Sequence, residues 1–245
     1  MKQSLFICSK AMDLTMERMS IISNNLANVN TVGYKKDNTY NLSFKNEFAR
    51  NINNIQCAEV PDQMKQVTDY TAGNYRFTND KLNMALVGDG FFKVQLPDGQ
   101  TAYTRKGVFS LNVKGELVLG DNPVLSKNNT PIKLQDSDIN VDSRGNIMNS
   151  SGLIVGQLNI VDFPKPYPLE KIGGTMFVPK EEVSEIPSNA QVRQQYLEES
   201  NVDALSSMIE MINLMEAMRQ YESQQKMVQL QDDATNRLIS DIART

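Results

Sequence analysis

The chain has 245 residues, of which 40% are apolar and 22% are charged, and its formal net charge is −4. This composition is typical of a folded protein, and the length allows one large domain or two ordinary ones. There is no run of about 18 apolar residues and no block of Lys and Arg, which argues against membrane insertion and against nucleic acid as a partner. Histidine is absent, which removes the commonest general base near neutral pH.

The first predicted element is a long amphipathic helix over residues 5–29. Its stripe follows alternating steps of three and four residues, the pattern of a helix packed along another helix. The stripe consists of Leu5, Cys8, Met12, Thr15, Met19, Ile22, Leu26 and Val29. The apolar run from Leu5 to Cys8 is shorter than the roughly 7–15 residues of a signal-peptide core. We therefore expect a mature helix and no cleaved signal peptide.

Turn-forming residues follow this helix: Asn24, Asn25, Asn28, Asn30 and Gly33. Asparagine tolerates left-handed backbone, and glycine allows the positive φ that a sharp turn requires. The next stretch, residues 37–69, is rich in asparagine and weakly patterned. It is predicted to be a linker or an extended arm rather than part of a core.

From about residue 70 the period changes from helical to alternating. Phe92, Val94 and Leu96 alternate with polar residues, and a Pro-Asp-Gly turn over residues 97–99 follows. Further short apolar alternations separated by Gly and Pro continue to about residue 179. Short strands at this spacing predict an antiparallel β-rich domain over residues 70–194.

The helical period returns near the end of the chain, over roughly residues 203–243. Its stripe opens with Ala204, Met208, Met211, Met215 and Met218, and it thins beyond Tyr221. Ser200 or Asn201 is the expected N-cap of this helix. The predicted fold class is therefore α+β, with the two terminal helices packed as a coiled-coil-like pair. Residues 1–36 together with 195–245 would form a discontinuous helical assembly domain.

Three patterns that resemble chemical sites are better explained structurally. Oxygen-bearing side chains alternate from Asp136 to Asp142, but the glycine and glutamate of a calcium loop are missing, so a strand with a polar outer face is expected. Gly88-Asp-Gly90 lacks the third glycine of a phosphate loop and precedes Phe91, so it predicts a turn before a strand. Five carboxylates lie on or beside the last helix and form no paired catalytic set: Glu198, Glu199, Glu210, Glu216 and Glu222. The sequence predicts no catalytic, cofactor or metal site.

Three stretches together resemble the bacterial flagellar rod and hook family of axial proteins. The first is Ser23-Asn-Asn-Leu-Ala-Asn-Val-Asn-Thr-Val-Gly-Tyr-Lys35. The second is Gly88-Asp-Gly-Phe-Phe92 followed by Pro97-Asp-Gly99 and Ala102-Tyr-Thr-Arg105, with Gly107 and Phe109. The third begins with Leu197-Glu-Glu-Ser-Asn-Val-Asp203. Length and the middle region favour the proximal rod protein, with the distal rod protein next, over the longer hook subunit.

The resemblance implies a non-enzymatic structural subunit of the periplasmic drive shaft. Such a subunit polymerises with copies of itself and with other rod and hook proteins, and the flagellar export apparatus carries it out unfolded. The expected assembly interface consists of Leu5, Met12, Met19, Ile22, Leu26, Met208, Met211, Ile212, Met215 and Met218. The turns that join the helices to the β domain are expected at Asn25, Asn28, Gly33, Ser200 and Asn201.

Two other functions remain open from the sequence. One is a secreted hydrolase or binding module built on the β domain, which would need a cleft with perturbed ionisable groups. The other is an adhesin-like or hook-like axial protein. Assembly that depends on concentration would favour the rod subunit over the binding module.

Overall fold

The computed structural model describes residues 2–42, 63–136, 138–180, 183–202 and 204–242. The chain divides into two compact units. Unit 1 comprises Met1–Ala27, Lys36–Asp69 and Val202–Thr245, and unit 2 comprises Asn28–Lys35 and Tyr70–Asn201. Both ends of the chain therefore belong to one unit. The units differ from the predicted domains in two ways: residues 28–35 and 195–201 belong to unit 2, and residues 37–69, predicted as a separate linker or arm, belong to unit 1.

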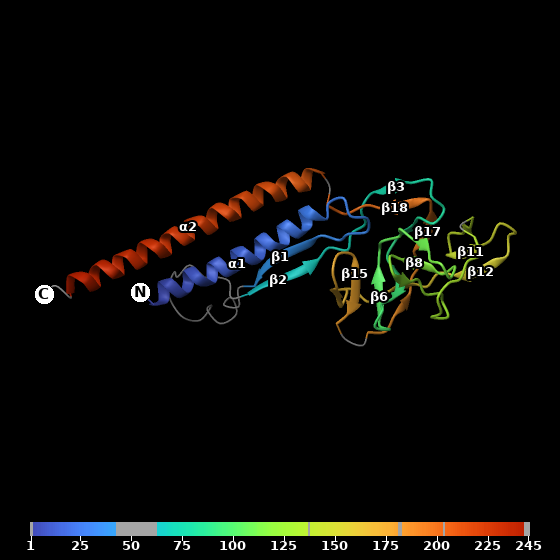
Figure 1. Cartoon of the computed structure of the whole chain (residues 1–245), viewed down its shortest axis with the longest axis horizontal. Helices are drawn as coiled ribbons and strands as arrows, with labels where there is room; N and C mark the ends of the chain where they lie inside the picture. Colours follow the sequence, from blue (N-terminus) through green and yellow to red (C-terminus); the bar gives the residue numbers. More distant parts are fainter. Residues whose placement is uncertain (1, 43–62, 137, 181–182, 203, 243–245) are drawn as a thin grey trace, which may run out of the picture. The chain divides into compact units, whose positions relative to one another are not determined.

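Unit 1 contains the two long helices, α1 (Lys2–Ala27) and α2 (Ala204–Ile242). They contact one another and run in opposite directions (Figure 1). Their bounds lie within a few residues of the predicted 5–29 and 203–243. The α+β class, with terminal helices around a strand-rich middle, is confirmed.

A two-stranded antiparallel sheet completes the described part of unit 1. It pairs β1 (Asp37–Leu42) with β2 (Gln63–Thr68), from Asp37 opposite Thr68 to Leu42 opposite Gln63. The predicted arm over residues 37–69 thus has paired strands at both ends, and its residues 43–62 lie outside the described residues. Strand β1 also contacts α1.

Unit 2 is built from short antiparallel strands. They are β3 (Tyr75–Phe77), β4 (Met84–Val87), β5 (Phe91–Gln95), β6 (Thr101–Thr104), β7 (Ser110–Leu111), β8 (Leu117–Leu119), β9 (Asn122–Pro123), β10 (Asn140–Val141), β11 (Asn146–Met148), β12 (Ile154–Gln157), β13 (Ile160–Asp162), β14 (Leu169–Lys171), β15 (Met176–Pro179), β16 (Ile186–Pro187), β17 (Gln191–Gln194) and β18 (Tyr196–Glu198). The largest described sheet has the order β14-β15-β6-β5-β13-β16. Two further pairings, β17 with β4 and β18 with β3, join the end of unit 2 to its beginning.

The central strand β5 separates two apolar cores. Phe92 belongs to a core that also contains Met84 and Leu117, whereas Phe91 packs with Phe177 in a smaller aromatic core. The two side chains enter different cores because successive side chains of a strand point to opposite faces, and neither has any exposed surface. The turn predicted at Gly88-Asp-Gly90 is confirmed: both glycines have positive φ, and β5 begins at the next residue.

The polar side chains of β5 and β6 are covered rather than solvated. Lys93 is only 6% exposed, and its Nζ lies 2.7 Å from Glu185 Oε1. The Tyr103 hydroxyl donates to the same carboxylate oxygen at 2.5 Å. Burial, reinforced by this acceptor, raises the pKa of Tyr103. The segment that carries Glu185 therefore closes over a strand that its alternating pattern alone would leave half-solvated.

Candidate assembly surface

Helix α2 carries large apolar side chains that the rest of the described chain does not cover. They are dense from residue 205 to residue 218, two more follow after a gap of nine positions, and each is between 47% and 74% exposed. They are Leu205, Met208, Ile209, Met211, Ile212, Met215, Met218, Met227 and Leu230. We call these nine residues the outer face of α2. Exposed apolar patches are typical of interaction sites, so the outer face of α2 is a candidate protein–protein contact.

The side of α2 that is covered has a different composition. Ala217 is 1% exposed, and residues one turn away, such as Asn213 and Tyr221, are partly buried. On α1 the buried positions include Leu14, Ile21 and Ile22. Within one chain, the covered side of α2 thus mixes small, polar and apolar residues, and all five methionines of the helix remain exposed.

The predicted interface residues differ in exposure between α1 and α2. On α1, Ile22 is buried, while Met12, Met19 and Leu26 are partly buried. The side chain of Leu5 lies outside the described part of the structure. On α2 the five predicted residues all belong to the outer face: Met208, Met211, Ile212, Met215 and Met218. The prediction omitted Leu205, Ile209, Met227 and Leu230. Leu205 and Ile209 each lie three positions before a predicted residue and could have been found from the spacing, whereas Met227 and Leu230 lie beyond the point where the stripe thins.

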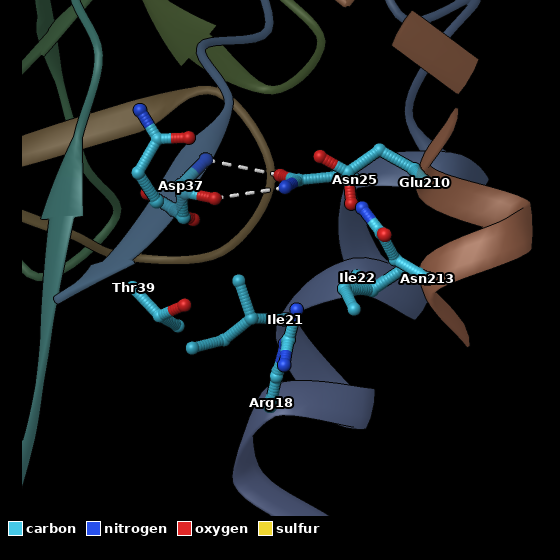
Figure 2. Close-up of a pocket in the computed structure, with 9 residues that line it drawn as sticks. Arg18, Ile21, Ile22, Asn25, Asp37, Thr39, Glu210 and Asn213 are labelled. Carbon is cyan, nitrogen blue, oxygen red and sulfur yellow. Dashed lines mark hydrogen bonds between the residues drawn. The ribbon is translucent and has the colours of Figure 1, made fainter. Parts of the chain in front are cut away.

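A pocket of about 270 Å³ lies inside unit 1, between α1, β1 and α2 (Figure 2). Ile21 and Ile22 form its apolar part, and Arg18 and Glu210 bring charges of opposite sign to it. At one end of the pocket, the Asn25 side chain forms hydrogen bonds with both the carbonyl and the amide of Asp37. Its Nδ2 donates to the Asp37 carbonyl at 2.8 Å, and its Oδ1 accepts from the Asp37 amide at 3.0 Å. The predicted turn residue Asn25 thus ties the end of α1 to the start of β1.

We expect Asn25→Ala to weaken the connection between the end of α1 and the start of β1. Asn25 is 2% exposed, so its removal leaves two backbone groups of Asp37 without these partners, at about 1–3 kcal/mol each. The measurement is amide hydrogen exchange at Asp37, which should become faster by about tenfold or more. Asn30→Ala, at an exposed position, is the matched control. Unchanged exchange at Asp37 in the Asn25 variant would contradict this role.

The remaining predicted turn residues lie in unit 2. Thr31 donates to Asn28 with both its amide (3.0 Å) and its hydroxyl (3.1 Å), which closes a tight turn. Gly33 has φ +70°, and a Cβ there would lie 2.5 Å from the backbone nitrogen of Lys106. The backbone therefore requires glycine at this position.

The third signature stretch lies beside this turn. The Asn201 amide donates to the Tyr34 carbonyl at 3.4 Å, and its side chain donates to Thr71. Ser200 is buried. Helix α2 begins at Ala204, so the expected N-cap role of Ser200 or Asn201 is wrong. Asn201 instead links two chain segments of unit 2.

Comparison with known protein families finds matches in each of the three signature stretches of the sequence. Residues 9–35 match the family described as flagella basal body rod protein. Residues 85–149 match the flagellar hook protein FlgE/F/G D1 domain, and residues 193–241 match the flagellar basal body rod FlgEFG protein C-terminal.

Curated relatives match along nearly their full lengths. The flagellar basal-body rod protein FlgG of Agrobacterium fabrum is 33% identical, over 94% of this chain and 96% of its own. FlgG of Bacillus subtilis is 30% identical, over 98% and 99%. This chain belongs to the flagellar basal-body rod protein family. FlgF of Buchnera aphidicola (Schizaphis graminum) is also similar, at 26% identity over 96% of both chains.

Membership in the rod family agrees with the chemistry of the described residues. The family is structural and non-enzymatic. A hydrogen bond from Lys165 lowers the pKa of Asp89, and burial raises the pKa of Tyr167. Both shifts favour the charge state that each group already has at neutral pH, so neither prepares a general acid or base there. Among the described residues, no cluster of metal-ligating side chains is found, and neither helix is apolar enough to cross a membrane.

Proposed function

We propose that this rod-family chain is a structural subunit of the bacterial flagellar basal-body rod and that it polymerises through α1 and α2. The observation that carries the proposal is the outer face of α2, whose nine large apolar side chains remain about half exposed or more in the single chain. Burying a fully exposed side chain of this kind contributes roughly 1.5–3 kcal/mol, so covering the half or more that is still exposed contributes a corresponding part of that. Copies of this chain and other axial proteins of the flagellum are the partners that would bury them.

The helices are proposed to pack side by side in a coiled-coil-like seam, both within a chain and between neighbours. The spacing of three and four residues on each helix supports this arrangement. In this proposal, residues 1–36 with 195–245 act as the assembly domain, residues 70–194 form an outer β domain, and residues 37–69 act as an arm. Many such contacts along a tube would allow it to transmit torque.

The cellular setting is proposed on the same basis. The subunit is expected in the periplasmic part of the basal body, after export as an unfolded chain by the flagellar export apparatus. The absence of a disulfide framework in the sequence is consistent with passage through a narrow conduit. Placement in the proximal rod rather than the distal rod stays a prediction from the sequence, because the relatives are named FlgG and FlgF without a rod segment.

The test is assembly of the purified full chain as a function of concentration. We expect sedimentation velocity to show large species at high concentration and circular dichroism to show a simultaneous rise in helix content. A chain that stays monomeric with constant helix content would contradict the proposal. A melting temperature that rises with added ligand would then favour a binding module. Imaging of basal bodies with and without the protein tests the location and separates a rod subunit from an adhesin-like or hook-like protein.

A further inference from the structure

The three signature stretches converge on one buried cluster of charges inside unit 2. Lys35 ends the first stretch, Arg105 lies in the second, and Glu198 lies in the third. Lys35 and Glu198 have no exposed surface, and Arg105 is 3% exposed. Residues separated by up to 163 positions thus share one solvent-free site. We call these three residues the buried charge cluster.

Glu198 is the centre of the cluster. Its Oε1 accepts from Lys35 Nζ at 2.5 Å and from the Gly73 amide at 3.2 Å. Its Oε2 accepts from Arg105 Nη1 at 3.4 Å, and its backbone carbonyl accepts from the Gly33 amide at 2.8 Å. A single glutamate thereby holds four other chain positions at once.

Lys35 extends the network to a further segment. Its ammonium group also donates to the Thr71 carbonyl at 2.6 Å, and Thr71 accepts from the side chain of Asn201. There is little room for the backbone to adjust, because a Cβ at Gly73 would lie 2.1 Å from the Glu199 carbonyl oxygen. Side-chain bonds and backbone packing therefore specify a single arrangement.

The cluster lies beside the places where the chain leaves unit 2. The chain passes between the units after residues 27, 35, 69 and 201. Lys35 is the last residue before one passage, Thr71 is the second residue after another, and Asn201 is the last before a third. One network inside unit 2 thus connects residues next to three of the four passages.

Stability alone is a poor explanation for this arrangement. Two cations and one carboxylate are buried together, and burying charges carries a desolvation cost that their attraction often fails to exceed. Apolar side chains of similar size commonly stabilise a site as well or better. Directional bonds, in contrast, specify one geometry, whereas methionines would accept several.

We propose that Glu198, with Lys35 and Arg105, is a positioning residue for rod assembly. The buried charge cluster connects the segments that lead into β1 and α2 and the segment that follows β2, so that every subunit begins these elements from the same backbone positions. The inference rests on the proposed function, since it assigns a task to the cluster in assembly.

The test compares a single with a triple substitution in the full chain. Glu198→Met leaves two buried cations without their carboxylate and should lower the melting temperature by about 10 °C. The triple variant Lys35→Met, Arg105→Met and Glu198→Met has no buried charge at this site and should melt well above the Glu198→Met variant. It should still melt somewhat below the unsubstituted chain, because the Gly73 amide loses its Glu198 acceptor. We expect this triple variant nevertheless to need at least about tenfold more protein to assemble.

The matched control is Lys93→Met with Glu185→Met. It removes another ion pair of unit 2, in which only Lys93 is buried and which does not adjoin any of the four passages, and it should leave the assembly concentration unchanged. Full assembly by the triple variant overturns the proposal, because the cluster would then be interchangeable with apolar packing. Loss of cooperative melting in the triple variant also overturns it, because the cluster would then be required for the fold of unit 2.

A second readout does not depend on assembly. Amide exchange at Gly33 and Asn201 should become at least about tenfold faster in the triple variant, while the amides of β5 and β6 stay protected. If the unsubstituted chain fails to assemble but these two amides exchange faster in the triple variant, the proposed rod function fails. The positioning role of the buried charge cluster within unit 2 is then still supported. Unchanged exchange at Gly33 and Asn201 in the triple variant overturns the positioning role of the buried charge cluster, whether or not the chain assembles.

Discussion

Met211→Asp is expected to block polymerisation while the single chain stays folded. Met211 is 49% exposed and lies on the outer face of α2, so a carboxylate there meets water in the monomer. In the assembled state the same carboxylate would be buried against apolar side chains without a partner, which costs several kcal/mol. We expect the concentration needed for assembly to rise by about 100-fold or more, measured by sedimentation.

The control for this substitution is Gln225→Asp on the same helix. Gln225 is exposed and belongs to the part of α2 where apolar residues thin out. The change adds the same carboxylate, and it should leave assembly nearly unaltered. The β-rich unit should melt at the same temperature in both variants. If the Met211 variant forms polymers at the unsubstituted concentration, the outer face is not the assembly surface.

Gly33→Ala is expected to cost about 3 kcal/mol or more. A left-handed backbone at φ +70° penalises any side chain by about 1–2 kcal/mol. The added Cβ would also lie 2.5–2.7 Å from backbone atoms of Arg105 and Lys106, which cannot rotate away. The hydrogen bond from the Gly33 amide to the Glu198 carbonyl would be strained as well. The melting temperature should fall by about 10 °C.

Gly120→Ala separates the conformational penalty of a positive φ from the steric cost of a Cβ close to backbone atoms. Gly120 has a similar φ of +63°, but nothing lies within 4 Å of its would-be Cβ. It should therefore show only the conformational penalty, a fall of about 3–5 °C. Equal losses in the two variants would mean that the close approach to residues 105 and 106 has no energetic consequence.

Local patterns predicted the elements of this protein well. Steps of three and four residues predict α1 and α2 within a few positions, because a helix must place its apolar residues on one side to bury them. Glycine and asparagine marked the turn at residues 28–33 for an equally local reason, since few residues tolerate positive φ. The pattern could not reveal the pairing of β1 with β2, because their ladder joins two weakly patterned segments across an intervening stretch.

The sequence by itself determined which residues are apolar, at what spacing they recur and where the backbone must turn. These properties predicted two terminal helices and a β-rich middle, and three motif stretches carried the resemblance to the rod and hook family. Only the tertiary structure decided which side of α2 is covered, since a helical stripe does not specify whether its partner belongs to the same chain. It also decided that Lys35, Arg105 and Glu198 meet, because a buried ion pair depends on residues far apart in sequence reaching the same solvent-free position.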